Sequence, residues 1–292
     1  MITQRAITLA LVGGSAALAT GASTAAHAQA LPPPKPFVSA LDLQCYKTPG
    51  PALNIDVNLT QLNPVLLELG MPPQVVTIRE LAQTCVPVRK NAAMPGPGVL
   101  PFIEQTDLAC YRVDAAPIAP IKLNLTHLNP VLANLPQHNV TLTRPAQLCV
   151  PIAKNGILPE PAVLALVRFI DLACYQVDPE PHPQFTVNLT QLNPQLGAIA
   201  PHPMTLVSSP RQLCVPVRKN AQMIPQAIVD LIQWIDLEKF AASPTVIIPP
   251  VSVSLRHLNP LFAGLPPVPV VLQEAIGLMV PVAKNGRLPS AE

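Results

Sequence analysis

Three short blocks recur four times in the same order, and this repetition constrains the fold more than any other feature of the chain. The first block, Asp42-Leu-Gln-Cys-Tyr46, returns as Asp107-Leu-Ala-Cys-Tyr111, Asp171-Leu-Ala-Cys-Tyr175 and Asp236-Leu-Glu-Lys-Phe240. The starting residues are separated by 65, 64 and 65 positions. A period of this size indicates that each copy is one supersecondary unit that stacks against its neighbours.

Two further blocks keep this spacing and set the predicted boundaries. Asn58-Leu-Thr-Gln-Leu-Asn-Pro64 recurs from Asn124, from Asn188 and, altered, from Ser254; Cys85-Val-Pro-Val-Arg-Lys-Asn91 recurs from Cys149, from Cys214 and, with methionine first, from Met279. We therefore predict a signal peptide at 1–30, a Pro-rich linker at 31–36, repeat 1 at 37–94, repeat 2 at 95–159, repeat 3 at 160–224 and repeat 4, which lacks the cysteine pair, at 225–292.

Within each copy the side chains alternate with a period of two. Ile121, Leu123 and Leu125 are separated by polar residues, and Val140 and Leu142 are separated by threonine. This alternation predicts half-buried strands. The Cys-Val-Pro-Val block is predicted at a sheet edge, because proline has no N–H to donate. The prediction is an all-β fold of four tandem repeats of about 65 residues, each with about four strands and one short helical turn.

The Leu-Asn-Pro triplets are predicted to start that helical turn. Asn63 can cap it, Pro64 suits its first position and Gly70 can end it. A C-terminal unit of a linear array has one neighbour, so residues 232–292 are expected to be the first region cut by limited proteolysis.

Six cysteines in an exported chain predict disulfides. The two positions of a copy lie 40, 39 and 40 residues apart, and both are lost together in repeat 4, as Lys239 and Met279. This joint loss favours pairs within a copy. The predicted pairs are Cys45–Cys85, Cys110–Cys149 and Cys174–Cys214. A ladder between copies, with Cys85 bonded to Cys110 and Cys149 to Cys174, is the alternative.

The first thirty residues predict export. Arg5 is followed by an uncharged Ala-rich stretch and by small-x-small sites ending at Ala28 and Ala30, where cleavage is expected. A transmembrane anchor is the less favoured alternative, because the stretch is only weakly hydrophobic. The formal net charge of +2 indicates no strong attraction to nucleic acid. The predicted location is periplasmic or secreted, with no transmembrane segment in the mature chain.

No residue pattern predicts catalytic, cofactor-binding or metal-binding residues. Known hydrolase and phosphate-binding motifs are absent from the sequence. His127 and His257 occupy the slot of Gln61 and Gln191, which predicts a polar turn residue, and metal binding by His182 and His202 is given little weight. One lysine per copy is interpreted as a solvated turn, with an anionic-polymer track as the alternative; these are Lys90, Lys154, Lys219 and Lys284. Asn58, Asn124 and Asn188 begin N-glycosylation sequons but are explained as outward strand residues.

The blocks Asp-Leu-Ala-Cys-Tyr, Val-Asn-Leu-Thr and Leu-Cys-Val-Pro-Val/Ile-x-Lys-Asn resemble a small β-rich module of unknown function that occurs in tandem in exported bacterial proteins. The resemblance covers residues 37–292. The module usually continues into an Asp-Gln-Phe-Gly-like turn, where this chain has Thr-Gln-Leu-Asn-Pro. The resemblance implies a fold and an exported location but no activity, so it assigns no functional residues.

These observations predict an exported, non-catalytic repeat protein that serves as a binding or structural module of the cell envelope or extracellular space. Its partner would be an envelope or extracellular ligand or protein that the sequence does not identify. The alternative is an exported hydrolase or redox enzyme with an unrecognised site. A unique polar cluster in one copy would discriminate the enzyme from the binding module, and only His182 and His202 in repeat 3 come close to one.

Overall fold

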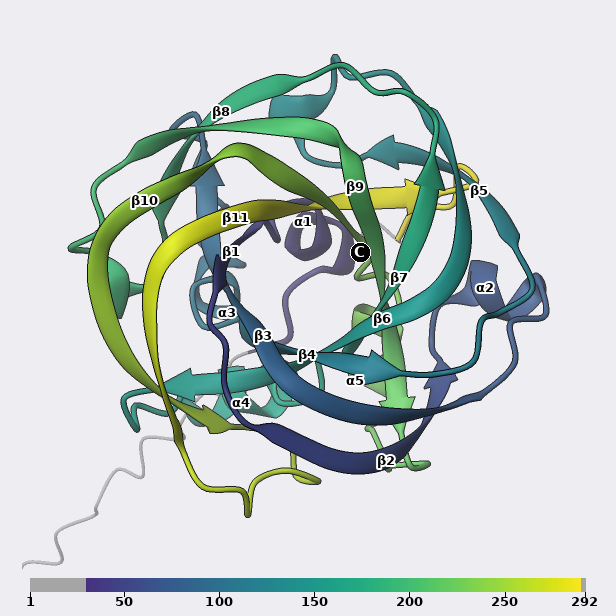
Figure 1. The fold of residues 1–292 in the computed structure, drawn as a ribbon, viewed down its shortest axis with the longest axis horizontal. Helices are drawn as coiled ribbons and strands as arrows, with labels where there is room; N and C mark the ends of the chain where they lie inside the picture. Colours follow the sequence, from purple (N-terminus) through teal and green to yellow (C-terminus); the bar gives the residue numbers. More distant parts are fainter. Residues whose placement is uncertain (1–29, 290–292) are drawn as a thin grey trace, which may run out of the picture.

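The computed structural model describes residues 30–289, so the predicted export signal lies outside the described residues apart from Ala30. Within this range the chain is mostly β, with eleven strands in one antiparallel sheet and a few short helices (Figure 1). The strands are β1 Leu43–Lys47, β2 Ala52–Gln61, β3 Gln74–Lys90, β4 Asp107–Asp114, β5 Ile121–His127, β6 His138–Lys154, β7 Leu172–Pro179, β8 Phe185–Gln191, β9 His202–Lys219, β10 Leu237–His257 and β11 Val268–Lys284. The helices are α1 Pro34–Ser39, α2 Pro64–Glu68, α3 Leu100–Ile103, α4 Pro161–Val167 and α5 Gln226–Ile232, with 3-10 turns η1 Pro130–Leu132 and η2 Pro194–Leu196.

Eight of the strands pair in a closed circuit. The order is β1, β3, β4, β6, β7, β9, β10 and β11, and β11 pairs again with β1. Figure 1 shows these strands curving around a common centre. The expectation that the C-terminal unit has one neighbour is therefore wrong, because β11 is paired with both β10 and β1. The prediction of early proteolysis in residues 232–292 rested on that expectation and therefore loses its physical basis.

The remaining strands join parts of the chain that are far apart in sequence. Strand β2 pairs with the start of β3 and, at its own end, with the end of β9, where Leu59 lies opposite Lys219. In the reciprocal arrangement, strand β8 pairs with the end of β3. The ends of β5 and β10 pair in the same way with the ends of β11 and β6. Residues 37–94 and 160–224 thus exchange strands, as do 95–159 and 225–292.

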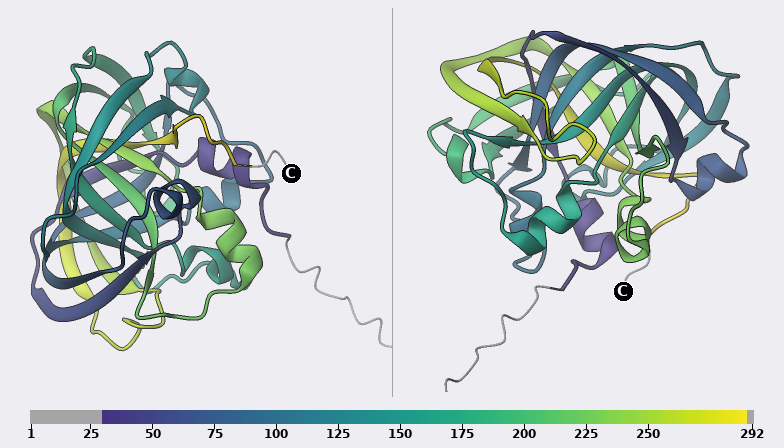
Figure 2. Two further views of the ribbon diagram at one scale, coloured as in Figure 1. Left: turned by 90° about the vertical axis from the view of Figure 1, so that its right-hand side faces the viewer. Right: turned by 90° about the horizontal axis from the view of Figure 1, so that it is seen from below.

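The two faces of the paired strands bury two separate cores. One core lies on the face that carries the cysteines, and the apolar sides of α1, α3, α4 and α5 pack into it. Figure 2 shows these helices gathered at one end of the strands. On the cysteine face Lys239 Nζ on β10 donates to Gln83 Oε1 on β3 at 2.6 Å, although two strands separate them in the circuit. That contact requires the cysteine face to be concave. The opposite face, which carries the tyrosines, forms the larger core.

The predicted disulfides are confirmed. Cys45–Cys85, Cys110–Cys149 and Cys174–Cys214 are bonded, with Cα–Cα distances of 4.0, 3.9 and 3.8 Å. Each pair joins directly opposed residues of neighbouring strands. Three disulfides are consistent with an oxidising compartment. None of the helices in residues 30–289 has the length and apolar character that crossing a lipid bilayer requires.

Two local predictions need correction. The alternating segment at Val140 and the Cys149 block form one 17-residue strand, β6, which keeps its pairing through register shifts between Leu142 and Gln147. The Cys-Val-Pro-Val block is not at a sheet edge, because β3 has β1 on one side and β4 on the other. Proline is tolerated because the pairing with β4 ends at Cys85, two residues before Pro87.

The predicted caps and turns are confirmed. The side-chain oxygen of Asn63 accepts from the backbone N–H groups of Val65 and Leu66, and Pro64 opens α2. Asn129 and Asn193 cap η1 and η2 in the same manner. The four asparagines that follow the recurring lysines have positive φ, as a tight turn requires; they are Asn91, Asn155, Asn220 and Asn285.

The missing disulfide of the C-terminal segment can be restored. Lys239 and Met279 are directly opposed on β10 and β11, as the bonded cysteines are on their own strands. We expect Lys239→Cys with Met279→Cys to form a bond and raise the free energy of unfolding by about 2–4 kcal/mol. Burial lowers the pKa of Lys239 to about 8, so removing its amine relieves a desolvation cost, which offsets the loss of its hydrogen bond to Gln83 Oε1. Urea denaturation of the oxidised and reduced double variant measures the gain; equal midpoints would contradict the prediction.

Candidate functional site

The recurring aspartates and lysines meet in buried ion pairs. The pairs are Asp42–Lys90, Asp107–Lys154, Asp171–Lys219 and Asp236–Lys284, and none of these side chains is more than 4% exposed. Both interpretations of the lysines, a solvated turn and a track for an anionic polymer, are therefore wrong. The turn begins only at the following asparagine, so each lysine is the last residue of a strand and its side chain still points inward.

A third residue from another part of the chain completes each pair. Asn129 Nδ2 donates to Asp42 Oδ2 at 2.6 Å, and Asn63 Nδ2 donates to Asp236 Oδ2 at 2.9 Å. Asn193 and Asn259 reach Asp107 and Asp171 at 2.9 and 2.6 Å. Burial raises the pKa of Asp42 to about 6, while Lys90 and Asn129 oppose that rise. These groups hold segments of the chain together, and their geometry indicates a structural role.

The recurring tyrosines define four polar corners on the other face of the sheet. At one corner Gln61 Nε2 donates to Tyr175 Oη at 2.9 Å, and the hydroxyl donates to Gln74 Oε1 at 3.0 Å. At a second corner Gln191 Nε2 donates to Tyr46 Oη at 3.0 Å.

The third corner uses histidine in place of glutamine. Tyr111 Oη and His257 Nε2 share a hydrogen bond of 2.9 Å. In each of these three corners a phenol bonds one polar atom of the glutamine or histidine, while Gln61 Oε1, Gln191 Oε1 and His257 Nδ1 have no partner among the described residues.

The fourth corner lacks this phenol, because Phe240 replaces tyrosine. His127, which corresponds to Gln61, packs 6.0 Å from the Phe240 ring, and neither of its ring nitrogens has a hydrogen-bond partner among the described residues. Two further imidazoles face it: the ring centroids of His138 and His182 lie 5.7 and 5.6 Å from that of His127. All three histidines are buried.

A glutamate and an arginine complete this corner. Glu238 stands where the other copies have Gln44 and alanine, and it is fully buried. Its Oε1 accepts from His138 Nε2 at 3.0 Å and from Arg211 Nη1 at 2.9 Å, while Oε2 has no partner among the described residues. We call His127, His138, His182, Glu238 and Arg211 the histidine corner.

The elements around the histidine corner come from three parts of the chain. His127 ends β5, His138 begins β6, Glu238 lies in β10 and Arg211 lies in β9. His182 lies in the loop between β7 and β8. That loop is held by Arg211, whose Nη2 donates to Glu180 O at 2.7 Å, and by Asn139, whose Nδ2 donates to Glu180 Oε1 at 3.0 Å.

Burial keeps the imidazoles of His127 and His182 in their neutral form. It lowers the pKa of His127 to about 3, with smaller effects from His138, His182, Lys90 and Arg211. Burial likewise lowers the pKa of His182. At neutral pH both rings therefore retain a free lone pair. Neutral imidazole is the form that binds transition metals.

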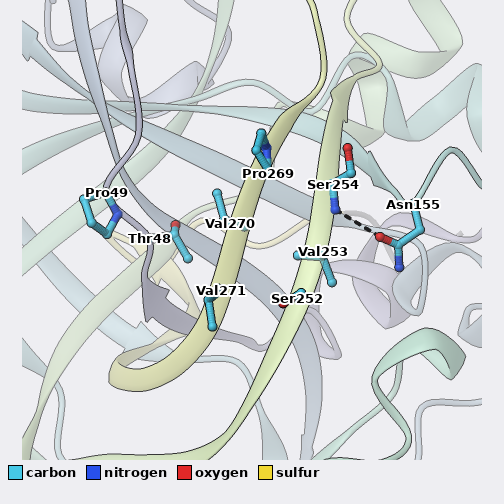
Figure 3. Close-up of a pocket in the computed structure, with 9 residues that line it drawn as sticks. All are labelled: Thr48, Pro49, Asn155, Ser252, Val253, Ser254, Pro269, Val270 and Val271. Carbon is cyan, nitrogen blue, oxygen red and sulfur yellow. Dashed lines mark hydrogen bonds between the residues drawn. The ribbon is translucent and has the colours of Figure 1, made fainter.

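A separate surface hollow of about 610 Å³ lies between β10, β11 and the loop after β1 (Figure 3). Figure 3 shows the valines and serines of the two strands on its floor, with Asn155 Oδ1 accepting from the backbone N–H of Ser254 at one side. Its lining has no titratable side chain: Thr48, Pro49, Asn155, Ser252, Val253, Ser254, Pro269, Val270 and Val271. The histidine corner is therefore the richer candidate site.

Sequence reasoning found only part of this corner. The prediction of a polar turn residue at His127 and His257 is wrong, because both are buried at the ends of strands. The structure separates the pair His182 and His202: His202 bonds to Gln44 at 2.7 Å, in a different corner. His138, Glu238 and Arg211 were missed. The usable signal was the simultaneous change to Glu238 and Phe240 in one copy of an otherwise repeated block.

Comparison of the chain with protein-family models, curated proteins and solved structures finds no match. The resemblance to the exported β-rich module stays a prediction.

Proposed function

We propose that this chain is an exported, non-catalytic repeat protein of the cell envelope or extracellular space, in which four copies of about 65 residues build a rigid body with one specialised binding corner. The observation that carries the proposal is the difference between the four polar corners. Three are closed by hydrogen bonds to a tyrosine hydroxyl. The histidine corner has Phe240 instead, and it brings three buried imidazoles together, with ring nitrogens of His127 and His182 that have no partner among the described residues.

The recurring charged residues support a non-catalytic body. Each recurring aspartate is bound to a buried lysine, so its charge serves cohesion rather than proton transfer. The six cysteines are joined in disulfides and offer no thiolate nucleophile. The disulfides also agree with the export predicted from residues 1–30.

A direct assay separates a binding module from an enzyme. The mature protein, residues 31–292, is incubated with peptidoglycan and lipopolysaccharide in sedimentation assays, and with chromogenic ester, peptide, glycoside and phosphate substrates. We expect saturable binding to an envelope polymer and no turnover. Turnover that disappears in His182→Ala but persists in His257→Gln would overturn the proposal in favour of a hydrolase. The His257→Gln variant is the matched control, because Gln61 and Gln191 occupy the equivalent slot.

A further inference from the structure

The histidine corner brings together three imidazoles that no structural requirement explains. One ligand atom from each of His127, His138 and His182 can be chosen so that all three lie within 4.8 Å of one another. The equivalent positions at the other corners are filled by glutamine, histidine or valine and need no third imidazole. His182 has no counterpart at those corners, since it comes from the β7–β8 loop.

For His182, a hydrogen bond to a backbone carbonyl determines which ring nitrogen is left to bind a metal. His182 Nδ1 lies 2.9 Å from Pro183 O and donates to it, which leaves the lone pair of the buried Nε2 without a partner among the described residues. Neither ring nitrogen of His127 has a partner among the described residues, so whichever nitrogen lacks the proton offers its lone pair. A backbone carbonyl on one ring nitrogen is the usual way in which proteins orient the other towards a metal.

His138 can join them by shifting its proton. Its Nε2 now donates to Glu238 Oε1, while its Nδ1 lies 3.4 Å from Pro136 O. Moving the proton from Nε2 to Nδ1 releases no proton and frees the Nε2 lone pair; a rotation of the ring away from Glu238 Oε1 then brings Nε2 to the other imidazoles. Glu238 keeps its bond to Arg211 and stays beside the site as an orienting partner, outside the group of three ligand atoms.

We propose that the histidine corner binds one divalent first-row transition-metal ion, with Zn²⁺ as the representative, through His127, His138 and His182, with Glu238 beside them. Three imidazole nitrogens, with water as a fourth ligand, suit Zn²⁺ and its neighbours, whereas Mg²⁺ and Ca²⁺ prefer sets of oxygen donors. Nitrogens that share a tetrahedral zinc lie about 3.4 Å apart, so the three ligand atoms, which lie within 4.8 Å of one another, have to approach by side-chain rotation when the ion binds. This inference names the ligand class of the binding corner and so rests on the proposed function.

The test uses tag-free mature protein, dialysed against chelator and then titrated with ZnCl₂ in a calorimeter. We expect saturation at one ion per chain. CoCl₂ is expected to give the visible absorption of a four-coordinate site, and MgCl₂ and CaCl₂ to give no signal.

Matched variants assign the site. His182→Ala and His127→Gln are expected to weaken Zn²⁺ binding at least about 100-fold, and Glu238→Gln about 10-fold. His127→Gln and Glu238→Gln copy residues found at other corners, so they should fold. His257→Gln, which changes a histidine bonded to Tyr111, is expected to leave the affinity unchanged.

A variant that restores the residue of the other corners addresses the origin of the site. Phe240→Tyr restores the phenol of the other corners, which should bond His127 and weaken Zn²⁺ binding while the protein stays folded. Absence of Zn²⁺ and Co²⁺ binding, or binding that is equal in the wild type, His127→Gln and His182→Ala, would overturn the metal proposal. Polymer binding and turnover are measured in a separate assay. Failure of the metal proposal therefore does not decide whether the proposed function is correct.

Discussion

Replacing Asp42 with asparagine is expected to lower the free energy of unfolding by about 3–5 kcal/mol. The substitution keeps the shape of the side chain but leaves Lys90, which is fully buried, without its counter-charge. It also replaces the oxygen that accepts from Asn129. Removing an ammonium group from water costs free energy, and without a partner no interaction offsets that cost. Urea denaturation of the oxidised variant measures the loss.

The matched control removes both charges. Asp42→Leu with Lys90→Met is expected to recover most of the lost stability, because a buried ion pair replaced by apolar groups of similar size is often neutral. Arg79→Met with Asp114→Leu removes an exposed pair and is expected to change stability by less than about 1 kcal/mol. An effect of Asp42→Asn no larger than this surface control would contradict the assignment of Asp42–Lys90 as a buried junction.

Loss of the central disulfide is expected to have a similarly large effect. Cys110→Ala with Cys149→Ala opens a loop of 39 residues, and chain entropy alone assigns about 4 kcal/mol to a loop of that length. This disulfide also contacts both of the others: Cys85 Sγ lies 3.9 Å from Cys110 Sγ, and Cys174 Sγ lies 3.6 Å from Cys149 Sγ. Its removal therefore disturbs the packing of its neighbours as well.

The other two disulfides provide the comparison. Cys45–Cys85 and Cys174–Cys214 close loops of nearly equal length, with sequence separations of 40 and 40, so the entropic contribution is the same. Each contacts one disulfide rather than two. Denaturation midpoints of the three double-alanine variants should thus be lowest for Cys110/Cys149. Equal midpoints would show that contact between the disulfides contributes nothing to stability.

The sequence predicted the local structure and the disulfides but not the way the strands close. Alternation around Leu123 shows which side chains are buried, and the joint loss at Lys239 and Met279 shows which cysteines pair. Neither observation carries information on long-range partners. The pairing of β1 with β11, and of β2 with β9, depends on the curvature of long strands. The alternation of buried and exposed side chains along a strand does not reveal that curvature.

The candidate site was harder to predict for a related reason. When equivalent positions of the four copies are compared, His127 is interchangeable with Gln61. Within its own copy, nothing distinguishes the two residues. What makes His127 different is its contact with Phe240 and His182, which lie on other parts of the chain. The buried lysines were missed because a Lys-Asn pair before a turn is typical of solvent-exposed sequence, and only the structure shows Asp42 beside Lys90.

The pairing of β1 with β11 also determines the order of assembly. Strand β1 is made first and β11 last, so one edge of β1 has no partner until nearly the whole described chain has been synthesised. The same holds for β2, whose end waits for β9. Domains held together by such distant contacts fold slowly and late. A nascent chain of this kind cannot close its circuit of strands until β11 has been made.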